Sequence, residues 1–344
     1  MSAVTTPSLG RAVRPFFDLG VAIDLRDLVA GPREVIAHQF TSVTAENAMK
    51  PAWIQPTEGR FEFEAADAIV AAARAHGQRV YGHTLFWHHQ TPAWWFHHPD
   101  GTPLTNAPGD RRLLLDRAAT HAGTLIEHFG DDVWAWEVVN EAVDETEPDL
   151  MRRTPWRRIL GPSYVEQLLH LTRSVAPRAT LVVNEFETEG PRKLHAYATL
   201  VRGLLDRGAP LDATGHQCHL TLETSVPQLE LAIEHMAQLG VDQVITELDV
   251  SISRDPQESL ALPPADRMAE QESFYDELFS MLLRHADSLR AVTLWGVGDG
   301  HSWLRYWPTI RLHEAPLLFD DLLRPKPAFW RALDAARSAQ ASAV

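Results

Sequence analysis

The chain has 344 residues, enough for one large α/β domain or two small ones, and its 45% hydrophobic content is typical of a globular protein. Lys and Arg number 31 against 46 Asp and Glu, and the formal net charge of −15 disfavours a nucleic-acid partner, whose phosphates it would repel. Cys218 is the only cysteine, which excludes an intrachain disulfide, and no window of about 18 apolar residues predicts a membrane span.

Short apolar segments alternate with longer amphipathic ones along the chain. The predicted strands are 16–23, 40–43, 79–85, 133–139, 180–184, 212–219, 243–249 and 291–296. The predicted helices between them are 64–76, 112–129, 163–175, 191–207, 227–239 and 269–287. Alternation of this kind is typical of parallel strands joined by crossover helices.

Eight such repeats without a Gly/Ser-rich linker favour a single closed (β/α)8 barrel, the TIM-barrel architecture, over an open sheet. We expect this domain to span residues 16–336, with tails at 1–15 and 337–344. Residues 88–110 and 250–266 are long loops, which in a barrel are usually functional or lid-like.

Polar residues occur where most of the predicted strands end, which is where a barrel of this type carries its active site. They are Glu46, Asn47, Lys50, His83, Asn140, Glu141, Asn184, Glu185, Gln217, His219, Glu247 and Asp249. Taken singly, each has a structural explanation: Glu141 as a first-turn helix residue, Glu247 as an ion-pair partner, the histidines as core residues. Their convergence on one rim favours a functional site.

Two glutamates without a metal motif indicate a reaction that needs a proton donor and a nucleophile or base. A metal site is the main alternative, but HExxH, CxxC and DxDxDG patterns are absent from the sequence. In the 212–219 strand, His216 and Cys218 alternate with Gln217 and His219 and therefore face away from them. The adjacent His88 and His89 show no ligand spacing, and no GxGxxG or GxxxxGK[ST] motif supports a nucleotide cofactor.

Six motifs in colinear order resemble those of glycoside hydrolase family 10, the retaining endo-β-1,4-xylanases, over about residues 16–335. They are TAENAMK (44–50), GHTLFWHHQTPAW (82–94), WEVVNEA (136–142), ITELDV (245–250), LWGVGDGHSW (294–303) and PLLFDDLLRPKPAFW (316–330). The resemblance implies a (β/α)8 barrel, no cofactor or metal requirement, and hydrolysis within xylan or xylo-oligosaccharide chains with retention of configuration.

The same resemblance assigns roles by position. It implies that Glu141 is the acid/base, that Glu247 is the nucleophile, and that Asp249 interacts with His219 without itself touching the substrate. The implied substrate contacts are Glu46, Asn47, Lys50, His83, Trp87, Gln90, Asn140, Phe186, Gln217, His219, Trp295 and Trp303. In such a pair the charge on Glu247 favours the protonated form of Glu141, and forming the glycosyl ester removes that charge.

The segment NEFE at 184–187 departs from the family pattern, which usually reads NDYN. Phe186 keeps an aromatic ring on the leaving-group side but lacks a hydroxyl, and Glu187 replaces an amide by a carboxylate. We expect Glu187 either to favour the protonated form of Glu141 or to narrow the leaving-group subsites towards short substrates. The alternative is that Glu187 faces solvent.

The first 20 residues lack the continuous apolar segment of a secretion signal, and we expect a cytoplasmic enzyme acting on imported xylo-oligosaccharides. Three rival functions remain: a non-catalytic sugar-binding barrel, the same mechanism acting on another β-linked glycan or an aryl glycoside, and a metal-dependent amidohydrolase. The sequence leaves the oligomeric state open.

Overall fold

The fold is a closed barrel of eight parallel strands surrounded by helices, as predicted, in a computed structural model that describes residues 4–255, 258 and 262–342. The eight strands of the ring are β1 (Asp18–Ile23), β2 (Ser42–Ala45), β3 (Arg79–Gly82), β4 (Val133–Asn140), β5 (Thr180–Glu185), β6 (Ala213–His216), β8 (Asp242–Ser251) and β9 (Leu289–Leu294). A further short strand, β7 (His219–Thr221), pairs with the end of β8. Neighbours pair in parallel in chain order, and the β6–β8 and β1–β9 pairings close the ring.

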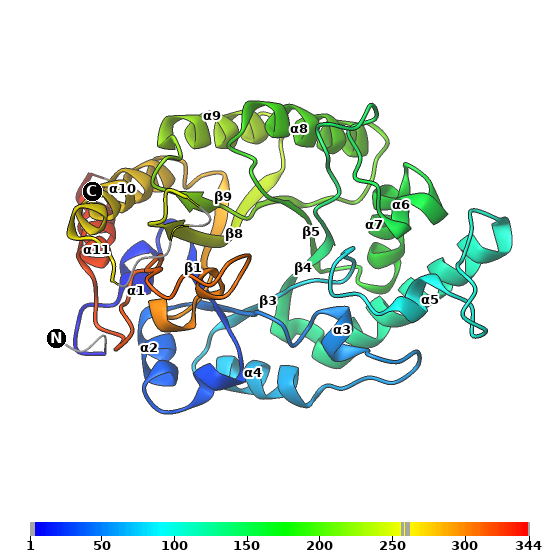
Figure 1. Ribbon diagram of the computed structural model, residues 1–344, viewed down its shortest axis with the longest axis horizontal. Coiled ribbons are helices and arrows are strands. Elements are labelled where there is room, and N and C mark those ends of the chain that lie inside the picture. The colour runs from blue at the N-terminus through cyan, green and yellow to red at the C-terminus, as the bar shows by residue number, and fades with distance from the viewer. Residues whose placement is uncertain (1–3, 256–257, 259–261, 343–344) are drawn as a thin grey trace.

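Helices form an outer layer around this ring (Figure 1). They are α1 (Leu9–Val13), α2 (Pro32–Gln39), α3 (Pro51–Ile54), α4 (Glu64–Ala75), α5 (Pro108–Phe129), α6 (Pro155–Leu160), α7 (Tyr164–Val175), α8 (Pro191–Asp206), α9 (Val226–Ala237), α10 (Ala265–Arg284) and α11 (Pro327–Ser342). Several begin with proline, which is favoured in the first turn of a helix. The backbone N–H that proline lacks would have no hydrogen-bond partner within the helix at that position. Among the described residues, no helix combines the length and apolarity that crossing a membrane would demand.

The hydrophobic core has two parts, one inside the barrel and one between the strands and the helices. A small interior cluster comprises Tyr81, Ala135, Val182, Ala213, Val244 and Ala291, one residue from each of six strands. The larger cluster lies between the sheet and the helices and includes Trp136 and Val138 of β4. Strands buried on both faces explain why β1 reads as an almost continuous apolar segment.

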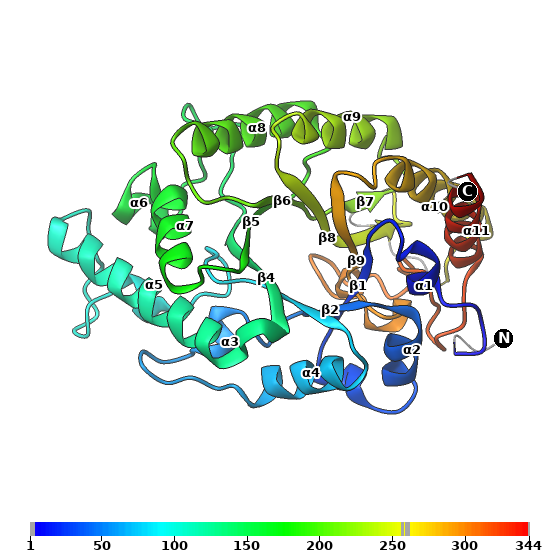
Figure 2. The same ribbon diagram turned by 180° about the vertical axis from the view of Figure 1, so that it is seen from behind.

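The strand predicted over 212–219 is divided into two, because the chain turns sharply after β6. Cys218 has a φ of 58°, in the left-handed region, and the chain then resumes as β7, which pairs only with the far end of β8 (Figure 2). As predicted, His216 faces away from the site: its ring contacts Thr188 and Gln243. The turn directs Gln217 and His219 to the carboxyl end of the barrel.

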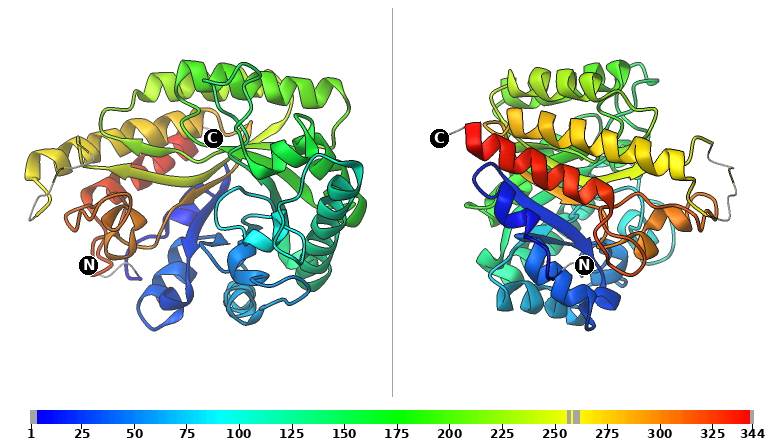
Figure 3. Two further views of the ribbon diagram at one scale, coloured as in Figure 1. Left: turned by 45° about the vertical axis from the view of Figure 1, so that its right-hand side comes forward. Right: turned by 90° about the vertical axis from the view of Figure 1, so that its left-hand side faces the viewer.

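Helices occupy part of each predicted tail. Helix α1 lies within the tail expected at residues 1–15; its Leu9 and Val13 are buried, and the helix contacts α11. Helix α11 runs past the predicted boundary at 336 to Ser342, and it packs along α10 (Figure 3). Of the 250–266 loop, β8 takes the first two residues, and residues 256–257 and 259–261 lie outside the described part of the chain.

Candidate active site

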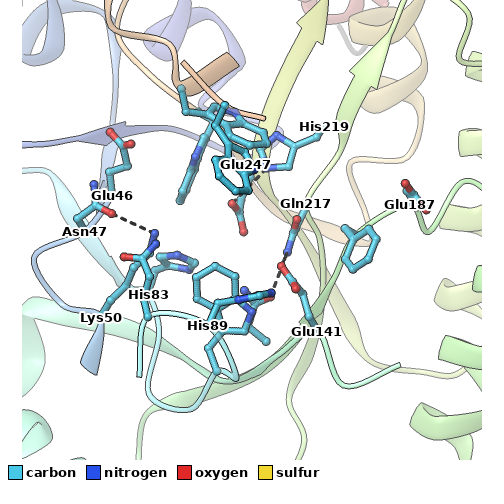
Figure 4. Close-up of a pocket in the computed structure, with 17 residues that line it drawn as sticks. Glu46, Asn47, Lys50, His83, His89, Glu141, Glu187, Gln217, His219 and Glu247 are labelled. Atoms are coloured by element: carbon cyan, nitrogen blue, oxygen red, sulfur yellow. Dashed lines mark hydrogen bonds and ion pairs between the residues drawn. The ribbon is translucent and has the colours of Figure 1, made fainter. Parts of the chain in front are cut away.

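A cavity of about 690 Å³ lies over the carboxyl ends of the barrel strands (Figure 4). Every residue predicted to touch a substrate lines it: Glu46, Asn47, Lys50, His83, Trp87, Gln90, Asn140, Glu141, Phe186, Gln217, His219, Glu247, Trp295 and Trp303. His89, Glu187 and Trp307 also line it. The parallel topology thus brings residues from seven loops or strands to one place, as the polar strand ends indicated.

Glu247 is buried in the second half of β8 and is held by groups from neighbouring strands. His219 Nε2 lies 3.3 Å from Glu247 Oε2, and Asn184 Nδ2 donates to Glu247 Oε1 at 3.1 Å. The other ring nitrogen of His219 lies 3.1 Å from Asp249 Oδ1, an ion-pair distance. The predicted support of His219 by Asp249 is therefore present in the geometry.

This arrangement favours an ionised Glu247 beside a protonated His219. Burial opposes charge on His219, but Asp249 and Glu247 outweigh burial and raise its pKa to about 10. Burial alone would raise the pKa of Glu247, whereas the His219 hydrogen bond and the nearby positive charges, Lys50 among them, lower it below the ordinary glutamate value. The Glu247 carboxylate is thus negatively charged near neutral pH.

Glu141 follows β4 in a backbone conformation that side-chain-bearing residues seldom adopt, with a φ of 57°. Its N–H donates to the carbonyl of Asn184 at 3.0 Å, and its own carbonyl accepts from Arg152 Nε at 3.1 Å. Gln217 Nε2 donates to its side-chain Oε1 at 3.1 Å. Neighbouring elements therefore impose this conformation, which is a frequent feature of functional sites.

Three side-chain amides connect the two carboxylates. Gln217 and Asn184 both donate to Asn140 Oδ1, at 3.1 and 3.2 Å. Because its oxygen is occupied, Asn140 offers a ligand its NH2, a donor suited to a hydroxyl. Asn184 was recognised in the sequence only as a polar strand end, and no role followed from it; its function as a bridge depends on the packing of β5 between β4 and β6.

Glu137, the buried carboxylate within β4, belongs to the floor of this site. It accepts from the Tyr81 hydroxyl at 3.3 Å, and its Oε1 lies 3.1 Å from His83 Nδ1. Burial raises the pKa of Glu137, and His83 opposes this in part. Since His83 in turn lines the cavity beside Trp295, with ring centroids 5.2 Å apart, Glu137 fixes the orientation of a ring that a ligand would meet.

At one end of the cavity, the residues after β2 form a polar group. Lys50 Nζ donates to Asn47 Oδ1 at 3.2 Å and lies 5.4 Å from the Trp87 ring centroid. Burial lowers the pKa of Lys50, against the opposing charges of Glu247 and Glu46. Glu46 pairs with Arg26 at 3.1 Å. Donors and acceptors alternate here, a pattern suited to a ring of hydroxyl groups.

Indole rings cover the cavity from the side of β9. Trp303 is fixed by donation from its Nε1 to Asp249 Oδ2 at 2.8 Å, and its ring lies 4.8 Å from that of His219. Trp295 contacts His219 as well as His83. Trp307 is 66% exposed and was not predicted, because an isolated tryptophan in a loop is more often a core residue.

Glu187 lies at the opposite end of the cavity (Figure 4), and its neighbour Phe186 also lines the cavity. Lys193 Nζ lies 4.0 Å from the Phe186 ring centroid and 3.1 Å from Glu185 Oε1. Burial raises the pKa of Glu185 to about 7, although Lys193 opposes this shift. Glu187 is exposed, as the alternative expectation had it, and it also borders the cavity. Its expected effect on Glu141 or on the leaving-group subsites stays a prediction.

Two groups of side chains here have donor atoms close enough to surround a metal ion. His83, Glu137 and Glu247 place one donor each within 4.8 Å of one another, but hydrogen bonds to protein groups already engage both carboxylates. His88, His89 and Glu141 form the second group. Burial, His89 and Arg152 lower the pKa of His88 to about 3, which keeps its ring neutral. The sequence did not indicate this group, because Glu141 comes from another strand.

Comparison with known proteins agrees with the geometry. The family described as glycosyl hydrolase family 10 matches residues 8–335. Endo-1,4-beta-xylanase B of Paenibacillus barcinonensis is 37% identical over 94% of this chain and 97% of its own length. A thermostable celloxylanase of Thermoclostridium stercorarium is also 37% identical, over 98% of this chain and 89% of that protein.

Solved structures show the same fold. Xylanase B from Clostridium stercorarium F9 superposes with a TM-score of 0.92 at 37% identity, covering 96% of this chain and 100% of that one. TsXylA, described as an intracellular xylanase from Thermoanaerobacterium saccharolyticum, superposes with a TM-score of 0.86 at 35% identity, covering 95% of this chain and 98% of that one.

Proposed function

The chain belongs to glycosyl hydrolase family 10, and from this premise we propose that it is an endo-1,4-β-xylanase that retains anomeric configuration by means of Glu247 and Glu141. The observation that carries the proposal is that an ionised carboxylate and a second carboxyl group line one cavity and are connected through Gln217, Asn140 and Asn184. A retaining mechanism requires the two carboxyl groups to be about 5–5.5 Å apart.

In the first step, a Glu247 oxygen forms a bond to the anomeric carbon while the bond from that carbon to the leaving oxygen breaks. Glu141 gives its proton to the departing oxygen. The hydrogen bonds from His219 and Asn184 keep Glu247 ionised and aimed, so that little reorganisation is needed during the attack. The positive charge of His219 also offsets the cost of burying this carboxylate.

In the second step, water attacks the same carbon and the ester to Glu247 breaks. Glu141, now ionised, takes the proton of that water and returns to its starting state. The NH2 of Asn140 is placed to donate to a sugar hydroxyl next to the reacting carbon, a contact that strengthens as charge develops there.

Substrate specificity tests the proposal. Product analysis on xylotetraose and cellotetraose under identical conditions should show cleavage of the xylose chain at a rate at least about 100-fold higher, since a sugar with an added hydroxymethyl group meets the indoles over the cavity. Glu247→Gln should retain xylotetraose binding and lose turnover. Binding without turnover by the wild-type protein would instead identify a sugar-binding barrel.

We also propose that the enzyme prefers short soluble xylo-oligosaccharides. What supports this is the carboxylate of Glu187 at the leaving-group end, where a long chain would have to pass. Glu187→Asn should shift products of xylohexaose towards longer fragments and raise activity on polymeric xylan relative to xylotetraose. An unchanged product distribution and an unchanged pH–rate profile would show that Glu187 affects neither the substrate preference nor Glu141.

A second candidate is the same chemistry on another β-linked glycan. It is favoured by one relative that bears the name celloxylanase at 37% identity over most of this chain. Comparable rates on xylotetraose and cellotetraose would establish this broader activity without altering the mechanism.

We propose a cytoplasmic location, as expected for an enzyme acting on imported oligosaccharides. One structural relative, described as intracellular, supports this. Cell fractionation of the native organism, followed by immunodetection, should place the protein with cytoplasmic markers; recovery from the culture medium would contradict the proposal.

A further inference from the structure

His88, His89 and Glu141 bring metal-binding atoms close together beside the cavity, which His89 and Glu141 line. His88 Nε2 lies 3.9 Å from Glu141 Oε2, and the rings of His88 and His89 are 4.2 Å apart between centroids, at 45°. One donor atom from each of the three lies within 4.8 Å of the other two. In Figure 4, Glu141 and His89 both face the cavity. A ligand entering the cavity can therefore reach this group.

Two imidazoles and one carboxylate are a ligand set suited to Zn²⁺ and related transition-metal ions, whereas Mg²⁺ and Ca²⁺ prefer oxygen ligands alone. Ligand atoms lie about 2 Å from zinc, so that two of them around a tetrahedral ion are about 3.3 Å apart. The observed separation of 3.9 Å between His88 Nε2 and Glu141 Oε2 exceeds that value by about 0.6 Å, a difference that a side-chain rotation can close. Water from the cavity completes the coordination.

The His88 ring is free to bind a metal ion through Nε2. Among the described residues, the buried Nδ1 of His88 has no hydrogen-bond partner, so that the tautomer with its lone pair on Nε2 forms without the loss of a hydrogen bond. The same observation limits affinity, because a metal-binding histidine whose second nitrogen lacks a partner binds about 10–100-fold more weakly. The site therefore fits an exchangeable ion rather than a resident one.

We propose that His88, His89 and Glu141 form a site for a divalent transition-metal ion such as Zn²⁺, which inhibits the enzyme reversibly. The ion takes the Glu141 carboxylate as a ligand, so that this group no longer holds the proton it must give to the leaving oxygen. The ion also occupies the space next to that carboxylate. The inhibitory consequence rests on the proposed function, whereas the binding site itself does not.

The test combines calorimetry with initial rates in metal-free buffer. Titration with ZnCl2 should show binding that is lost in Glu141→Gln and in His89→Asn. On xylotetraose, Zn²⁺ should inhibit the wild-type enzyme, EDTA should restore the rate, and Mg²⁺ or Ca²⁺ should have no effect. In His89→Asn, the zinc concentration that halves the variant's own zinc-free rate should rise at least 10-fold.

His285→Asn is the matched control, because Glu230, Glu234 and His285 form another group of metal-binding side chains on the outer surface. This variant should be inhibited by zinc as the wild type is. Equal calorimetric binding by wild type and His89→Asn, or loss of inhibition in His285→Asn alone, would overturn the proposal. If xylotetraose were not hydrolysed, the proposed function would fail while the calorimetry still decided the metal site.

Discussion

Glu141 owes its position to backbone contacts from two other segments rather than to its own conformational preference. A non-glycine residue with a φ of 57° is strained, and the carbonyl of Asn184 and the guanidinium of Arg152 hold it in place. Arg152 also donates to the Val143 carbonyl at 3.1 Å, so that it clamps both ends of this turn. Arg152 is therefore a positioning residue, which acts through Glu141.

Replacing this clamp should lower turnover more than it weakens binding. A lysine cannot make both hydrogen bonds of the planar guanidinium, and we expect Arg152→Lys to reduce kcat about 10–100-fold with little change in KM. Steady-state kinetics on xylotetraose measure both constants. Arg153→Lys is the control, because Arg153 is exposed and pairs only with Glu147 among the described residues. Equal effects of the two substitutions would refute this role.

The charge on Glu247 depends on His219, which makes a pH prediction possible. Glu247 must be ionised to attack, and the His219 hydrogen bond lowers its pKa. In His219→Asn the shorter amide replaces the nitrogen that faces Asp249 but not the one that faces Glu247. The pKa of Glu247 then rises, and the acidic limb of the kcat/KM profile should move to higher pH by roughly 1–2 units. A lower rate with an unmoved acidic limb would contradict this explanation.

At the residue scale, the sequence predicted which side chains meet but not how they are joined. Glu141 directly follows β4 and Glu247 lies in the second half of β8, and the parallel topology explains why they share a cavity. The bridge through Asn184 depends on which way a side chain within β5 points, and the approach of His89 to Glu141 depends on side-chain directions in the irregular segments after β3 and β4. No periodicity in the sequence carries that information.

The strands β5, β6 and β8 form the side of the barrel that holds the amide connection. Gly215 in β6 lies opposite Asn184 in β5, and a Cβ at Gly215 would overlap the Asn184 side-chain oxygen. Thr246 on β8 donates to that same oxygen at 2.9 Å. Because Gly215 has no side chain, β6 leaves space for the Asn184 side chain to reach Glu247 and Asn140.

Filling this space should affect both stability and catalysis. We expect Gly215→Ala to lower the free energy of unfolding by about 1–3 kcal/mol through overpacking, and to reduce kcat by displacing Asn184. Denaturant titration and steady-state kinetics measure the two effects. The control is Gly123→Ala within α5, where an added methyl group meets only Val175 at 3.9 Å and should leave stability unchanged or raise it by up to about 1 kcal/mol. Wild-type behaviour of Gly215→Ala would contradict the packing argument.

The limits of prediction at this scale lie at the ends of the elements. The predicted strand 212–219 covers β6, the turn at Cys218 and only the first residue of β7, because the residue pattern alone does not mark the left-handed turn at Cys218. Helix α1 was missed because five residues are too few to show a helical period. Long amphipathic segments such as α4 and α8 began at the predicted residue.

Across the whole molecule, the barrel was predictable because its signal is repeated eight times, and each repeat reinforces the others. Closure through the β6–β8 and β1–β9 pairings then requires all the carboxyl ends to face one side. The substrate is harder to predict from the sequence, because the fit of a sugar depends on the three-dimensional positions of Trp295, Trp303 and Trp307.

The central claim is that Glu247 forms a covalent intermediate while Glu141 serves first as acid and then as base. Two successive inversions at one carbon leave the configuration unchanged. Proton NMR of xylotetraose hydrolysis, recorded before mutarotation, follows the anomeric protons directly. The β-anomer of the newly formed reducing end should appear first and convert slowly to the equilibrium mixture. Initial release of the α-anomer would mean a single displacement by water and would contradict the mechanism proposed for these two glutamates.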